Sequence, residues 1–230
     1  MSILKMGKNV FRIDDLLGES EILESLVREI IKSNLDKGLW KFDGEILIAN
    51  SQQRLLIALR ALELGADIER TCKFLTWEEF EDFAVLEFEA NNFNVTKHFR
   101  FNWLGRRWEI DLLGIKKPFV VSADCKHWKR GWRGSSSLKA AEFQIERTKA
   151  LAEASPLLIE KIGLHGWKEA YFMPIVLSLL PAANKFHMGC PIVPILQFRS
   201  LLVELPARIQ EVAYYHKNFW SNKMTNLNKN

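Results

Sequence analysis

The chain has 230 residues, of which 48% are hydrophobic and 26% are charged, and its formal net charge is +4. This composition is typical of a soluble globular protein with one or two domains. Its longest apolar stretch, residues 171–183, contains two prolines and is shorter than the ~20 residues of a membrane helix, which argues against a membrane protein. The three cysteines lie far apart and form no CxxC motif, and the chain begins without a signal-peptide pattern, so we expect a cytoplasmic protein.

Acidic and basic residues are unevenly distributed along the chain. Residues 1–93 contain 11 Lys and Arg against 18 Asp and Glu, whereas residues 94–230 contain 21 against 10. Ten basic and three acidic residues lie between Lys97 and Arg133. This density of positive charge is typical either of a surface that binds a polyanion such as nucleic acid or of a solvated basic face, and charge alone does not separate the two.

The first 75 residues are predicted to be mainly helical. Apolar residues at helical spacing predict a helix over residues 20–35, and residues 39–49 form two short apolar runs around an Asp-Gly dipeptide, which is typical of a hairpin. Asn50 or Ser51 can cap a second helix that ends at Gly65. We interpret this region either as a small winged-helix-like module or as a helical packing or dimerisation domain.

From residue 76 the pattern changes to alternating helices and strands. Thr76 and Glu79 form a capping box for a helix that reaches about Asn91. Most of the six acidic side chains of this helix are expected at the surface, and one could face the interior. Strands are then predicted over residues 95–103, 108–115, 119–125, 171–180 and 190–198, and helices over 137–154, with Ser137 as its cap, and 199–205. The order predicts one α/β domain over residues 76–220, between the domain of residues 1–75 and a polar tail of residues 221–230.

Charged residues interrupt the second and third of these strands. Alternate residues of a strand share a face, so Asp124 lies beside Lys126, and Glu109 lies beside Asp111. A hairpin turning at residues 116–118 brings the two faces together, so Asp111 and Asp124 converge, with or without Glu109. Converging carboxylates suit a hard divalent cation such as Mg²⁺. The alternative is a structural Asp–Lys ion pair on an exposed sheet face.

Residues 76–133 resemble the PD-(D/E)xK nuclease superfamily, and among its members the Mrr-type restriction endonucleases and the archaeal Holliday-junction resolvases. WEIDLL is similar to the strand with the first metal-binding aspartate, and ADCKHW to the (D/E)-x-K strand. WEEFEDFAVLEFEANNFNV is similar to the helix that precedes them. The resemblance covers roughly residues 76–205 and implies a restriction-endonuclease-like core, with the order α-β-β-β-α-β-β.

The resemblance also implies roles for individual residues. Asp111 and Asp124 would bind Mg²⁺, or alternatively Mn²⁺, with the Cys125 carbonyl as a further ligand. Lys126 would position or activate the attacking water, and Glu81 would be a third acidic group, acting directly or through a water.

Glu109 lies outside the minimal motif, and it is either an extra metal ligand or the partner of Arg106 or Arg107. Glu142, Gln144 and Arg147 lie on the following helix, where some relatives place accessory polar groups, and no spacing singles one of them out.

Basic and aromatic residues around the motif predict a nucleic-acid surface. The residues expected to contact DNA are Arg100, Arg106, Arg107, Lys129, Arg130, Trp132 and Arg133. We therefore expect a metal-dependent DNA endonuclease acting on double-stranded or branched DNA, and the resemblance implies a homodimer. The alternatives are a structure-selective resolvase of the Holliday-junction type, a non-catalytic nucleic-acid-binding protein that kept the fold, and a purely structural partner protein.

Overall fold

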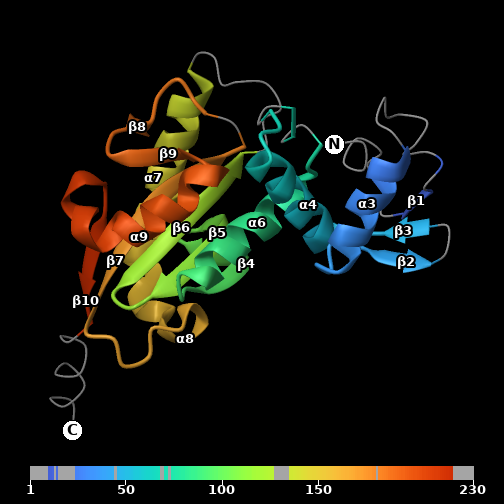
Figure 1. Ribbon diagram of the computed structural model, residues 1–230. Coiled ribbons are helices and arrows are strands. Elements are labelled where there is room, and N and C mark those ends of the chain that lie inside the picture. Colours follow the sequence, from blue (N-terminus) through green and yellow to red (C-terminus); the bar gives the residue numbers. More distant parts are fainter. Residues whose placement is uncertain are drawn as a thin grey trace, which may run out of the picture. The chain divides into compact units, whose positions relative to one another are not determined.

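The computed structural model describes residues 10–12, 14, 24–43, 46–67, 70–71, 74–126, 135–179 and 181–219 (Figure 1). The chain forms two compact units, Met1–Phe83 and Ala84–Asn230. The boundary between them falls inside helix α6 (Trp77–Ala90), whereas the sequence predicts a boundary before that helix, at residue 75. No helix among the described residues is long and apolar enough to cross a membrane.

The first unit combines helices with a small antiparallel sheet. Its described elements are strand β1 (Val10–Arg12), helix α3 (Glu24–Leu35), strands β2 (Lys41–Asp43) and β3 (Ile46–Ile48), and helix α4 (Ser51–Glu63), with the strands in the order β1-β3-β2. The predicted helix and the two predicted hairpin strands are therefore present. Gly44, in the predicted turn, lies outside the described residues.

Helices α4 and α6 each begin with a capping box. Asn50 Oδ1 accepts a hydrogen bond from the Gln53 N–H at 2.8 Å, and Gln53 Oε1 accepts one from the Asn50 N–H at 3.0 Å. The predicted box of α6 is also confirmed, because Thr76 Oγ1 accepts from the Glu79 N–H and Glu79 Oε2 accepts from the Thr76 N–H. Glu79 is buried and also forms an ion pair with the buried Arg54. At least one acidic side chain of α6 therefore does face inward.

The second unit has a mixed α/β fold. Within the described residues its seven strands follow the order β4-β5-β6-β7-β9-β8, and β10 pairs with β7. The β6–β7 and β7–β9 pairs are parallel and the others are antiparallel. The strands are β4 (Asn94–Trp103), β5 (Arg106–Lys116), β6 (Phe119–Lys126), β7 (Glu169–Ser178), β8 (Phe186–His187), β9 (Cys190–Pro194) and β10 (Tyr215–Asn218), and the helices after α6 are α7 (Ser136–Ala154), α8 (Ile159–Ile162) and α9 (Phe198–Arg208).

The predicted sequence of elements is present, with additions. Helix α8 and strands β8 and β10 were not predicted, and the strand predicted over residues 190–198 ends at Pro194, where a 3₁₀ turn begins. The prediction that Ser137 caps α7 is wrong. Ser135 is the cap residue, and the buried Ser137 hydroxyl has no hydrogen-bond partner among the described residues. The helix starts earlier than predicted because Ser136 and Ser137 already have helical conformation.

Helix α6 packs closely on β5 because of a glycine. Phe88 is fully buried, and its ring contacts those of Phe93 and Phe198 with centroid separations of 5.4 and 4.8 Å. A Cβ atom on Gly114 of β5 would lie only 2.3 Å from the Phe88 ring. The absence of a side chain at residue 114 therefore lets the helix approach the sheet.

Candidate active site

The β5–β6 hairpin separates where its acidic residues begin. Its turn is at Lys117–Pro118, as predicted, and the pairing runs from Lys116 and Phe119 to Leu112 and Ala123, where it stops. Beyond that point β5 stays paired with β4, and β6 stays paired with β7 (Figure 1). Continuing the register places Asp111 opposite Asp124, so these two residues face each other across the opening.

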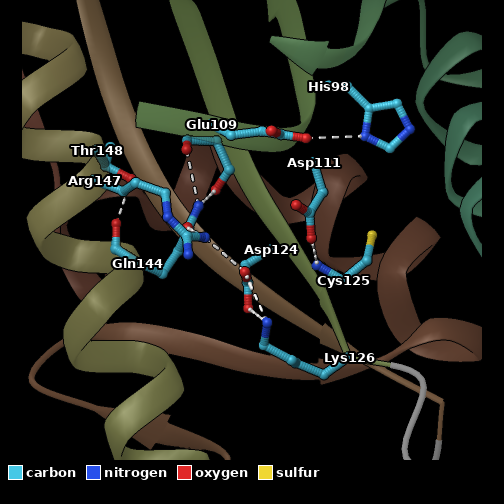
Figure 2. A network of polar contacts seen from close by, with 10 residues as sticks. His98, Glu109, Asp111, Asp124, Cys125, Lys126, Gln144, Arg147 and Thr148 are labelled. Carbon is cyan, nitrogen blue, oxygen red and sulfur yellow. Dashed lines mark hydrogen bonds and ion pairs between the residues drawn. The ribbon is translucent and has the colours of Figure 1, made fainter. Parts of the chain in front are cut away.

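Asp111 is anchored to the neighbouring strand by a backbone hydrogen bond. Its Oδ2 accepts from the Cys125 N–H at 2.8 Å (Figure 2). Burial raises the pKa of Asp111, and the negative charge of Asp124 raises it further, against a smaller lowering by the Cys125 N–H and nearby cations. Burial and the charge of Asp124 therefore both disfavour the ionised form of Asp111, and a bound cation would offset both effects.

Asp124 is buried between two cations. It is 2% exposed, and its two carboxylate oxygens lie 3.0 and 2.9 Å from Lys126 Nζ. Arg147 Nη1 donates to Oδ1 at 2.6 Å, so Asp124 lies between Lys126 and Arg147 (Figure 2). The predicted common face of Asp124 and Lys126 is confirmed. A buried carboxylate needs such compensation, because its desolvation otherwise costs several kcal/mol.

Arg147 is itself held in place by a buried glutamine. It donates a second hydrogen bond to Gln144 Oε1 at 3.1 Å. Gln144 is fully buried, and its Nε2 donates to the Ser122 carbonyl at 2.6 Å and to the Ser122 hydroxyl at 2.8 Å. This chain of contacts ties α7 to β6 two residues before Asp124. The i, i+3 spacing of Gln144 and Arg147 accounts for their contact with each other, but it does not identify Ser122 or Asp124 as their partners.

Glu109 is paired with β4. Arg100, its cross-strand neighbour, donates two hydrogen bonds at 2.8 and 3.4 Å, and His98 Nδ1 lies 3.5 Å from Oε1. The hydrogen bond from Arg100 lowers the pKa of Glu109. The expectation that Arg106 or Arg107 is the partner is wrong, because the pairing register places Arg100 opposite Glu109.

Two further predicted residues are buried. Glu81 lies on α6, is 3% exposed, and accepts a hydrogen bond from Trp77 Nε1 at 2.7 Å. The Cys125 side chain is fully buried, with Sγ within 4.8 Å of a carboxylate oxygen of Asp111. The structure therefore ties Cys125 to Asp111 through its N–H, and the role of its carbonyl stays a prediction.

The predicted nucleic-acid residues have different surroundings. Arg106 donates to Glu146 at 2.7 Å and stacks on the Trp108 ring at 3.9 Å from its centroid, whereas Arg107 is exposed. Four other predicted contacts, Lys129, Arg130, Trp132 and Arg133, lie outside the described residues.

The donor atoms around Asp111 and Asp124 fit a hard cation. Both side chains offer carboxylate oxygens, the ligands that Mg²⁺ and Mn²⁺ prefer, and they emerge at the same opening of the sheet. A buried thiol, as on Cys125, is a soft ligand and does not suit these ions. Lys126 and Arg147 also contact Asp124 and supply positive charge there.

Comparisons with known proteins do not identify an activity for this site. No protein-family model matches the chain. A protein of Archaeoglobus fulgidus, described as uncharacterized, is 26% identical over 140 residues, which is 61% of this chain and 99% of that protein. A crystal structure of a protein of unknown function is similar with a TM-score of 0.31 and 15% identity, over 46% of this chain and 48% of that one. The function must therefore be argued from the site.

Proposed function

We propose that this protein is a metal-dependent DNA endonuclease with a restriction-endonuclease-like core in its second unit. The observation that carries the proposal is the opening of the β5–β6 hairpin, where Asp111 and Asp124 face each other and Lys126 contacts Asp124. Two acidic residues on neighbouring strands, with a lysine two residues after the second, are the arrangement that the PD-(D/E)xK resemblance implies. The order of α6, β4, β5, β6, α7, β7 and β9 agrees with the core expected from the same resemblance.

Each residue of the proposed site has a defined task. Asp111 and Asp124 would hold Mg²⁺ or Mn²⁺ through their carboxylates. A divalent ion there would polarise a phosphoryl oxygen and lower the pKa of a bound water. Lys126, whose ammonium already lies at the site, would orient the attacking water or stabilise the charge that develops on the phosphate.

Glu81 remains the proposed third acidic group. It lies seven residues before Phe88, so both side chains lie on the same face of α6, and Phe88 contacts β5 at Gly114. A buried carboxylate on this face has a large desolvation cost, which a functional role would explain. Glu109 is a weaker candidate for a metal ligand, because Arg100 already occupies both of its oxygens.

One observation favours a second candidate, a non-catalytic nucleic-acid-binding protein that kept the fold. Lys126 and Arg147 both contact Asp124, and their positive charges balance that of its carboxylate. A protein in which this ion-pair network is purely structural would bind DNA through its basic surface and would not cut it.

Cleavage of a DNA panel separates the two candidates. Supercoiled plasmid, linear duplex, single strand, flap and four-way junction are incubated with Mg²⁺, Mn²⁺ or EDTA, using the intact protein, Asp111→Asn, Lys126→Ala and the control Lys149→Ala. We expect metal-dependent cutting that is lost in Asp111→Asn and Lys126→Ala and kept in Lys149→Ala, an exposed lysine on α7. A preference for the junction would identify a structure-selective resolvase. Binding without cutting in either metal would refute the nuclease and support the second candidate.

The proposed homodimer is tested separately by light scattering of the intact protein, with and without a duplex. A 26.7 kDa species without DNA, together with a complex of one chain per duplex, would refute it.

A further inference from the structure

A polar surface pocket lies beside the proposed active site. It has a volume of about 610 Å³ and lies between the β4–β5 hairpin and α8. The residues that line it are Arg100, Phe101, Asn102, Arg107, Trp108, Glu109 and Lys161. It therefore brings three basic side chains together with one acidic one.

The single acid of the pocket is already neutralised. Glu109 accepts two hydrogen bonds from Arg100 and lies 3.5 Å from the imidazole of His98. Arg107 and Lys161 contact no acidic side chain in the part of the chain that the structure describes. The pocket therefore carries unbalanced positive charge, which favours an anionic ligand.

Lys161 is held in position but keeps donors for a ligand. Its Nζ donates to the Arg100 carbonyl at 2.5 Å and lies 5.4 Å from the Phe99 ring centroid. An ammonium has three N–H donors, so two remain available. Arg107 is exposed and lies opposite Asn102 in the β4–β5 pairing. Its guanidinium offers the paired donors that bind phosphate oxygens.

The pocket is aligned with the proposed metal site. Arg107, Glu109 and Asp111 are alternate residues of β5, and at about 3.3 Å per residue Arg107 lies roughly 13 Å from Asp111. That distance corresponds to about four steps of 3.4 Å along a DNA duplex. A duplex seated at Asp111 would therefore extend far enough to place a backbone phosphate in the pocket.

We propose that this pocket binds a phosphate of the DNA backbone through Arg107 and Lys161 and thereby sets the position of the strand relative to Asp111. The inference rests on the proposed function, because it takes DNA as the ligand. It also distinguishes Arg106 from Arg107, both of which are predicted from the sequence to contact DNA. Arg106 is occupied by Glu146 and Trp108, whereas Arg107 is available for the phosphate.

Salt dependence of duplex binding in EDTA tests the inference. We compare the intact protein with Arg107→Gln, Lys161→Gln and the control Lys149→Gln, an exposed lysine on α7, and measure the dissociation constant between about 50 and 200 mM salt. Each phosphate contact contributes about 0.9 to the slope of log affinity against log salt. We expect the slope to fall by about that amount in Arg107→Gln and in Lys161→Gln and to be unchanged in Lys149→Gln. The same fall is expected for duplexes of unrelated sequence, because a phosphate contact does not depend on the bases.

The outcomes distinguish the inference from the function on which it rests. Cleavage by the intact protein together with unchanged salt slopes in Arg107→Gln and Lys161→Gln would overturn the phosphate pocket alone. An intact protein that neither binds nor cuts DNA would overturn both. Thermal unfolding of Lys161→Gln serves as a check, because loss of its bond to Arg100 can loosen α8. If the salt slope of Arg107→Gln equals that of the intact protein, the inference is overturned, whatever the result for Lys161→Gln.

Discussion

Arg147 is predicted to stabilise the second unit by compensating the buried charge of Asp124. Removing one partner of a fully buried ion pair costs about 3–5 kcal/mol, and an exposed pair contributes about 0–1 kcal/mol. The Asp124 side chain is 3% exposed and that of Arg147 is 25% exposed, and Lys126 stays in contact when Arg147 is removed. We therefore expect Arg147→Ala to lower the free energy of unfolding by about 2 kcal/mol.

Urea denaturation followed by tryptophan fluorescence and circular dichroism measures this loss. Arg147 Nη1 donates to both Asp124 and Gln144, and the shorter lysine side chain cannot place its ammonium at the same point. Arg147→Lys keeps the charge, so we expect it to lose about half as much stability. Glu146→Gln, on the exposed side of the same helix, is the control and should change stability by less than about 0.5 kcal/mol. A loss no larger than the control's in Arg147→Ala would refute the reasoning, since it would mean that Lys126 alone compensates the charge.

Two further predictions concern the core of this unit. Gly114→Ala should lower the free energy of unfolding by about 1–3 kcal/mol, because the new Cβ would overlap the Phe88 ring. Adding Phe88→Leu to this variant should recover part of the loss, as measured by urea denaturation in a double-mutant cycle. Burial raises the pKa of Cys190 from 9.0 to about 12, so the unfolded chain releases this proton first and stability should fall as the pH rises from 9 towards 12. Urea titrations should show that the free energy of unfolding falls between pH 8 and pH 10 by about 1 kcal/mol more in the intact protein than in Cys190→Ala. An equal fall in both proteins would contradict the assignment of this pH dependence to Cys190.

The local features of this protein could be predicted from its sequence. The capping boxes at Asn50 and at Thr76 join groups three residues apart, so their partners are visible in the sequence itself. The common face of Asp124 and Lys126 follows from the two-residue period of a strand, and the turn at Lys117–Pro118 then sets Asp111 near Asp124. These contacts depend on short-range geometry that every helix or strand shares.

The partners of the charged groups were decided only by the tertiary structure. Arg147 reaches Asp124 from 23 residues away, Glu109 pairs with Arg100, and Arg106 and Arg107 have different surroundings although they are adjacent. Each of these outcomes depends on which strands pair, in which register, and on which face α7 packs. Such long-range choices are set by the burial of the whole core, because a one-residue shift in register would exchange the buried and exposed faces of a strand.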